Sequence, residues 1–126
     1  MAVTFTPVYR ANLQENVSHT GIGIILGSMN LGNSYSTNGE PIDLDLIFSG
    51  LEAKALQILF GVSADGTTHY VWDSANAKVK AFVEDGTSKL FVEAANNGDL
   101  SAATKTAQCI ITYRIGQAQD DTPITL

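Results

Sequence analysis

The sequence predicts an all-β protein, an antiparallel β-sandwich or barrel with at most one short helix. Short apolar runs alternate along the whole chain with clusters of glycine, asparagine, aspartate and serine, which is typical of strands and turns. Two of these runs, at 69–73 and 79–84, are aromatic and β-branched and are spaced as the two arms of a hairpin. The 126 residues have the length of one domain, so we expect 1–126 to form a single β domain with a modest core.

The first two expected strands lie at 3–10 and 19–28. Pro7 cannot donate a backbone hydrogen bond, which predicts that the first strand lies at a sheet edge. Residues 30–41, rich in glycine, asparagine, serine and threonine, are expected to form a long loop. Side chains alternate between the two faces of a strand. One face of the second strand therefore carries Ile22, Ile24 and Leu26, and the other carries Gly21, Gly23 and Ile25.

The next part of the chain, 42–60, combines helical and extended signals. Residues 52–56 are good helix formers, and we expect a helix of one or two turns there. Residues 56–60 are apolar and are followed by Gly61, which predicts a buried strand.

The clearest element is the hairpin, in which 74–77 supply the turn between its two strands. Lys78 and Lys80 alternate around Val79, as the solvent face of a strand would. Further elements follow in chain order: a turn at 85–86, a short strand at 90–93, a loop at 96–99 and a final strand at 107–115.

The charge balance excludes one class of partner. The formal net charge is −6 and the isoelectric point is about 4.6, so phosphate backbones repel the chain and we expect no nucleic-acid partner. Charged residues make up only 16% of the sequence. A weakly ionised surface can be covered by a protein partner at little desolvation cost.

No secretory or membrane segment is expected. Residues 1–5 lack a basic region followed by an apolar run, and the longest apolar stretch, 22–26, is too short to cross a bilayer. The one cysteine, Cys109, lies in the apolar run 107–111, which predicts a buried and inert thiol.

The glycines at 21–27 superficially resemble a dinucleotide-binding fingerprint, but the third glycine lies one residue too far along. We expect these glycines instead to let another backbone or a large side chain approach the strand. His19 and His69 are expected at the surface, because Ser18, beside His19, points to the opposite face of the strand and no nucleophile and base are paired.

Two other groups of residues are candidates for binding a ligand. Asp43 and Asp45 share a face if the chain is extended there, but no loop of acids follows, so a solvated edge is expected instead of a calcium site. Tyr70, Trp72 and Phe82 suit a sugar platform, although a lone tryptophan in a hairpin is more often part of the core. We therefore predict no catalytic, cofactor-binding or metal-binding residues, no cofactor and no enzymatic activity.

Three pieces of the sequence follow one another in a recognisable order. Residues 35–42 read Tyr-Ser-Thr-Asn-Gly-Glu-Pro-Ile, after a strand with a small-residue end at 26–28. In the hairpin, 70–82, the second strand reads Lys-Val-Lys-Ala-Phe. Residues 97–101 read Asn-Gly-Asp-Leu-Ser and precede the last strand. In the order of these pieces, 17–116 resembles a family of small phage virion proteins.

This resemblance implies a capsid decoration (cement) protein with a jelly-roll-like β-sandwich, made in the host cytoplasm and placed on the outer surface of a phage head. Its implied partner is the major capsid protein, with no membrane contact. The resemblance also implies a homo-oligomer, with a trimer favoured and a dimer as the alternative. Binding only to the mature lattice stabilises that lattice by mass action.

The chain ends, 1–13 and 117–126, are expected to be flexible or partner-binding arms, because they are least able to bury themselves in the core. Two other functions remain open at this point. The first is another virion component, a head fibre or minor tail protein, and the second is a carbohydrate-binding β module that uses Trp72. Copy number on the particle and glycan binding separate these alternatives.

Overall fold

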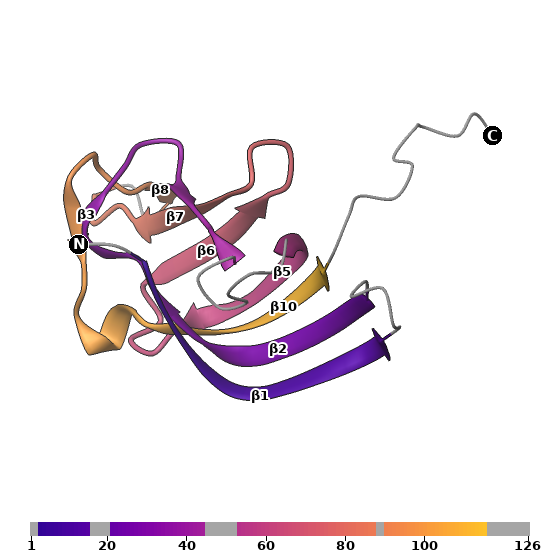
Figure 1. The fold of residues 1–126 in the computed structure, drawn as a ribbon. Helices are drawn as coiled ribbons and strands as arrows, with labels where there is room; N and C mark the ends of the chain where they lie inside the picture. Colours follow the sequence, from indigo (N-terminus) through magenta and orange to yellow (C-terminus); the bar gives the residue numbers. More distant parts are fainter. Residues whose placement is uncertain (1–2, 16–20, 45–52, 88–89, 116–126) are drawn as a thin grey trace.

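The computed structural model describes residues 3–15, 21–44, 53–87 and 90–115, and it confirms the all-β prediction (Figure 1). The strands are antiparallel, and their sheets pack in a sandwich-like arrangement with one turn of 3-10 helix, Ala103–Lys105. In chain order the strands are β1 (Thr4–Glu15), β2 (Gly21–Asn30), β3 (Gly32–Tyr35), β4 (Glu40–Pro41), β5 (Ala53–Ser63), β6 (Thr68–Asp73), β7 (Lys78–Glu84), β8 (Phe91–Glu93), β9 (Gly98–Leu100) and β10 (Ala107–Ile115).

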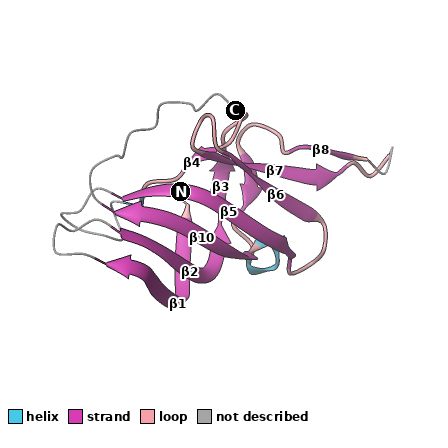
Figure 2. Cartoon of the chain, turned by 90° about the vertical axis from the view of Figure 1, so that its right-hand side faces the viewer, coloured by secondary structure: helices cyan, strands magenta, loops and turns pink. Residues whose placement is uncertain are grey.

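The larger sheet has four strands in the order β1-β2-β10-β5. Figure 2 shows them side by side as one layer. The last strand of the chain, β10, lies between β2 and β5 and pairs with both of them. Segments far apart in the sequence must therefore meet before this sheet is complete.

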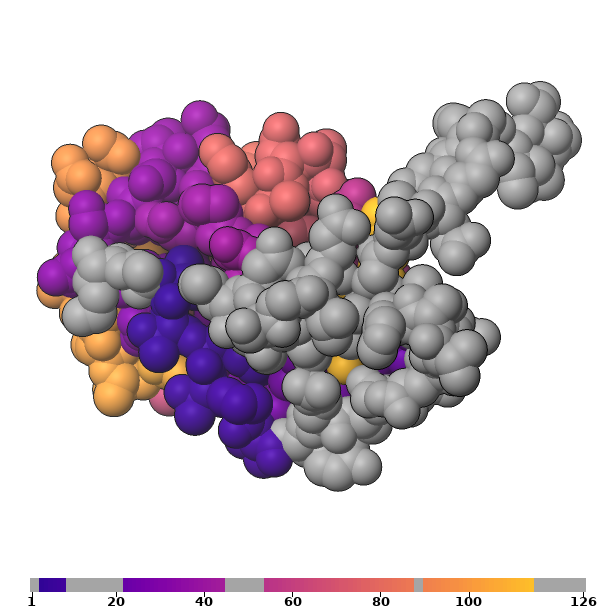
Figure 3. All heavy atoms as spheres, in the orientation of Figure 1, coloured from indigo at the N-terminus to yellow at the C-terminus, as the bar shows by residue number. Residues whose placement is uncertain are grey.

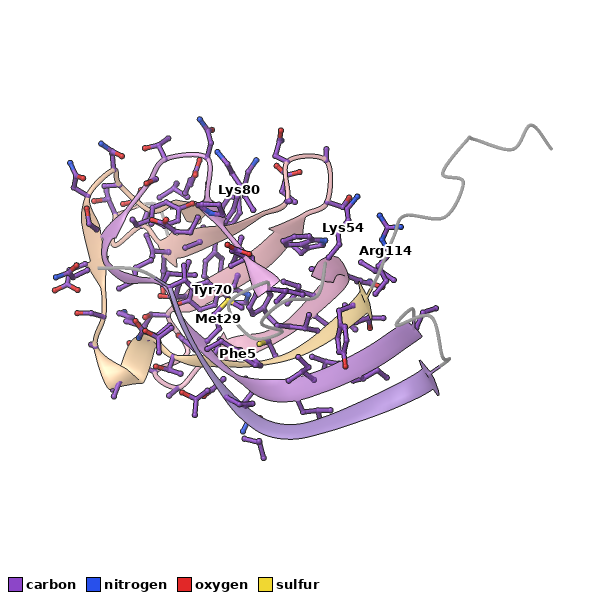
Figure 4. All side chains as sticks on the ribbon, in the orientation of Figure 1. Phe5, Met29, Lys54, Tyr70, Lys80 and Arg114 are labelled. Atoms are coloured by element: carbon purple, nitrogen blue, oxygen red, sulfur yellow. The ribbon has the colours of Figure 1, made fainter. Side chains whose placement is uncertain are left out.

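The second layer is built around β7. The predicted hairpin is confirmed, with β6 paired along one edge of β7. On the other edge, β4 pairs with residues 78–79 and β8 pairs with residues 82–84. Val79 is fully buried, whereas Lys80 points away from the core and its Nζ lies 3.6 Å from the Asp73 carboxylate (Figure 4). The strands β3 and β9 form a small ladder of their own.

The core lies between these layers. The inner face of the larger sheet contributes Met29, Ile58 and Ile111, and the second layer contributes Tyr70 and Val79. Figure 4 shows Met29 and Tyr70 in the space between the layers. The sandwich is thus filled by side chains from strands distributed along the whole described chain.

The first strand lies at the edge of the larger sheet, as Pro7 predicted. Its pairing with β2 shifts register between Pro7 and Tyr9 and again between Asn12 and Gln14. Residues 4–13 of the expected N-terminal arm lie in this strand, whereas the expected arm 117–126 lies outside the described residues.

Two glycines determine which face of β2 points into the core. A Cβ at Gly23 would overlap the side chain of Tyr113 on β10, and a Cβ at Gly27 would lie only 2.6 Å from Cζ of Phe5 on β1. Both glycines are buried, so they admit two aromatic rings against the backbone, as their spacing predicted. The opposite face of β2 consequently points away from the core.

Tyr35 connects β3 to the second layer. Its hydroxyl accepts a hydrogen bond from the Ala81 N–H at 3.1 Å and donates one to Glu93 Oε1 at 2.8 Å. This oxygen therefore occupies the edge of β7 between the segments paired with β4 and β8. The same Glu93 oxygen accepts the N–H of Asn38 at 2.6 Å, which fixes the turn after β3. Burial, reinforced by the bond to Glu93, raises the pKa of Tyr35 to about 12.

A polar cluster holds the 3-10 turn against the β5–β6 turn. Lys105 Nζ lies 2.9 Å from Asp65 Oδ2 and donates to Thr67 Oγ1 at 2.6 Å. The lysine is the largest cause, ahead of hydrogen bonds from Ser63 and Thr67, of an Asp65 pKa well below its usual value. The Tyr70 hydroxyl donates to the Lys105 backbone carbonyl and joins the core to this cluster.

The structure corrects the loop expected at 30–41. This segment contains the short strands β3 and β4. The sequence signal for a loop came from its glycine, asparagine and serine content. Burial of Tyr35 and the pairing of β4 with β7 provide the tertiary contacts that local composition does not report.

The helix expected at 52–56 is also wrong for the residues that the structure describes. Residues 53–56 belong to β5, because antiparallel pairing with β10 overrides the local helix propensity. The strand predicted at 56–60 is present but is only partly buried. Ile58 points into the core, whereas Leu56 and Leu59 are exposed.

We predict that Gly23→Ala lowers the free energy of unfolding by about 1–3 kcal/mol or more, because the new methyl group must displace the Tyr113 ring. Urea unfolding measures this loss. Gly86→Ala is the matched control, since its Cβ would meet nothing within 4 Å. Equal stability of the two variants would show that the contact between Gly23 and Tyr113 is not tight.

We predict that Tyr35→Phe costs about 1–3 kcal/mol, because the buried Ala81 N–H loses its acceptor. The measurement is the free energy of unfolding in denaturant. Glu93→Gln retains an acceptor oxygen for the Tyr35 hydroxyl and should cost less. A Tyr35→Phe protein as stable as the parent would rule out this hydrogen bond as a structural link.

Candidate functional site

The residues considered for chemistry do not come together in the part of the chain that the structure describes. His69 is exposed, and its ring lies edge-on to Phe91 with ring centroids 4.3 Å apart. Asp43 is exposed, whereas His19 and Asp45 lie outside the described residues. Among the described side chains, no group of three His, Cys, Asp or Glu residues is arranged to hold a metal ion.

The hairpin aromatics do not share one face. Tyr70 is buried and Trp72 packs partly buried against the core, while Phe82 pairs in register with His69 on the outer face. A flat sugar-binding platform needs these rings side by side and exposed. Trp72 therefore belongs to the core, as its position in a hairpin indicated.

The outer face of the larger sheet is the most distinctive surface of the molecule. Leu59, Ile110 and Leu26 lie in register on three adjacent strands, β5, β10 and β2. Their exposed fractions are 56%, 40% and 38%. We call the outward side chains of these strands, with this apolar row at their centre, the sheet face. A contiguous apolar surface of this kind commonly marks a contact with another protein.

An apolar hollow of about 480 Å³ lies along this row. All four strands line it, with Val8 from β1 and Gln108 from β10 beside the three residues of the row. Val8 is 81% exposed because it sits where the register of β1 shifts past that of β2. The row of Leu59, Ile110 and Leu26 thus lines a recess in the sheet face.

The charges are distributed unequally over the molecule. The four strands of the larger sheet contain three basic residues, Arg10, Lys54 and Arg114, and one acid, Glu15. Figure 4 shows Lys54 and Arg114 close together at one end of the sheet, and their backbones pair in register. The described acids outside these strands are Glu40, Asp43, Asp65, Asp73, Glu84, Asp85, Glu93 and Asp99. Lys54 and Arg114 therefore give one end of the larger sheet a basic character, although the whole chain is acidic.

A second apolar surface lies on the other layer. Val71, Leu90, Phe91 and Val92 are exposed on β6 and on or beside β8, with Phe91 and Val92 on opposite faces of β8. We call this group of side chains the hairpin strip. Figure 3 shows the hairpin along the upper side of the molecule and the N-terminal strand along the lower side. The two apolar surfaces therefore belong to different layers of the sandwich.

Sequence reasoning separated the two faces of β2 correctly but did not show which one was exposed. The signal that was available is the placement of glycines opposite aromatic residues on neighbouring strands. That signal becomes readable only when the register of β2 with β10 is known. The hairpin strip gave no sequence signal beyond an expected short strand at 90–93.

Cys109 precedes Ile110 and points to the inner side of the sheet, where it is buried as predicted. Burial raises the pKa of its thiol to about 12. Burial likewise raises the pKa of Tyr70 to about 12, with a smaller contribution from Asp65. These protonated groups belong to the core and are not arranged as nucleophiles.

No helix among the described residues is long and apolar enough to cross a membrane. No protein-family model, curated protein or solved structure matches the chain.

We predict that stability falls as the pH is raised from about 9 toward 12. In the unfolded chain the pKa values of cysteine and tyrosine are 9.0 and 10.0. In the folded protein the pKa values of Cys109, Tyr35 and Tyr70 are raised to about 12. The unfolded state then binds fewer protons, so the free energy of unfolding decreases with pH. Urea unfolding at several pH values measures this. In the Cys109→Ala variant the loss of stability should begin about one pH unit higher, at the pKa of unfolded tyrosine. An unchanged onset would contradict the contribution assigned to the Cys109 thiol.

Proposed function

We propose that this chain is a structural protein of a phage virion, a capsid decoration (cement) protein that binds the outer surface of the head and stabilises the mature capsid. The observation that carries the proposal is the pair of exposed apolar surfaces on a sandwich whose core is already filled. The sequence resemblance supplies the identity of the partner, the major capsid protein.

A protein that holds neighbouring subunits together must contact more than one of them. The sheet face and the hairpin strip lie on different layers, so the chain can contact the capsid through one surface and another molecule through the other at the same time. Each contact can be weak, because linked contacts raise the overall affinity without any catalytic group. A rigid antiparallel sandwich keeps the two surfaces at a fixed separation.

The hairpin strip is the surface that we assign to the capsid. Phe91 is its largest side chain and is nearly half exposed, with the His69 ring against its edge. Burying one such side chain in the contact stabilises the complex by about 1.5–3 kcal/mol. Many copies bound to one lattice multiply that contribution over the head.

The test is to add the purified chain to heads that lack it and to measure occupancy by quantitative mass spectrometry. We expect on the order of hundreds of copies per head, as a binder of a repeating lattice requires. Phe91→Lys should weaken binding about tenfold or more. Thr87→Lys, a nearby exposed position, adds the same charge outside the strip and should bind normally.

The same experiment separates the alternative virion positions. A few copies per particle, confined to the tail or to a fibre, would contradict a decoration role and favour a minor tail or head-fibre protein. Full occupancy by Phe91→Lys would place the capsid contact elsewhere on the molecule.

A further inference from the structure

We infer that the sheet face packs against the same face of a second copy of this chain, around a two-fold axis that runs along the row of Leu59, Ile110 and Leu26. These three side chains are exposed although they lie in register near the middle of the sheet. The inference concerns the free protein, so it does not depend on a capsid partner.

The area of the face is sufficient for a dimer. Four strands span about 19 Å, and the nine residues of β10 extend about 30 Å. Each copy therefore offers about 570 Å² before side-chain relief is counted, and two copies bury about 1,100 Å² together. That area reaches the lower bound of about 1,000 Å² for a specific protein interface.

The charge distribution favours this face over the others for contact between copies. Two chains of net charge −6 repel each other, and the described acids outside the larger sheet would come close if the second layers met. Packing through the sheet faces leaves those acids on the two outer sides of the pair. The interface itself then contains an apolar centre with few charges, which limits the desolvation cost.

The position of the basic residues fits a two-fold axis along the row. Arg114 lies four residues beyond Ile110 on β10, about 14 Å along the strand. A rotation about the row reverses the strand direction in the second copy, so its Arg114 and Lys54 lie at the opposite end of the interface. The basic ends are then far apart, while each residue of the row faces its own copy.

Edge-to-edge pairing through β1 is the competing arrangement, and this strand is poorly suited to it. Pro7 removes one donor, and the two register shifts break the regular spacing of the edge. The glycines of β2, which predicted the close approach of another backbone or a large side chain, already accommodate Tyr113 and Phe5 of the same chain. Contact through the face remains as the better supported arrangement.

Sedimentation equilibrium of the purified chain tests the stoichiometry, and we expect a dimer. Ile110→Lys and Leu59→Lys should each raise the dissociation constant about a hundredfold or more, because the interface would bury a charge without a partner. Val71→Lys places the same change on the other layer and should leave the dimer intact. Circular dichroism and thermal unfolding of each variant establish that it is folded.

Cross-linking tests the axis and needs no destabilising charge. Ile110 faces its own copy in this arrangement, so Ile110→Cys should form an intermolecular disulfide under mild oxidation, whereas Val71→Cys should not. The native Cys109 is buried and does not compete. A monomer at high concentration, a trimer, a dimer that persists in both lysine variants, or no cross-link at Ile110→Cys would each overturn the inference.

Discussion

The contact of Tyr113 and Phe5 with the two glycines of β2 determines how the larger sheet is oriented. Aromatic rings from β10 and β1 lie against the β2 backbone, in space that any side chain at Gly23 or Gly27 would fill. The glycine-bearing face of β2 must therefore point inward. Through the shared register, Ile111 of β10 and Ile58 of β5 point inward with it. The same alternation leaves Leu26, Ile110 and Leu59 on the outside.

A second junction keeps the layers together. Tyr35 places its hydroxyl at a gap in the pairing of β7, where it completes the hydrogen bonding of Ala81 and engages Glu93. A short strand of four residues is thereby fixed to the second layer by one side chain. At another point, Lys105 and Asp65 connect the 3-10 turn to the β5–β6 turn. Because these links involve buried or paired polar groups, they define one arrangement of the loops instead of adding only nonspecific attraction.

Exposure of apolar residues on both layers is the feature that relates this fold to function. Phe91 and Ile110 are substantially exposed, so packing inside the sandwich does not explain why they are hydrophobic. The proposed contacts with other molecules account for these side chains. The unequal distribution of charge distinguishes the two layers, because the strands of the larger sheet contain three basic residues and one acid, whereas the other described acids lie beyond it.

The sequence by itself determined the local features of this protein. Alternation and turn residues located the hairpin and the final strand, Pro7 placed β1 at an edge, and an apolar run buried Cys109. Only the tertiary structure decided the long-range features. It made residues 53–56 a strand through pairing with β10, and it turned the isoleucine face of β2 outward through Tyr113 and Phe5. The physical reason for this division is that a local sequence pattern indicates the periodicity of apolar residues and the flexibility of the backbone. Which face of a strand is exposed depends instead on which distant side chains pack against it.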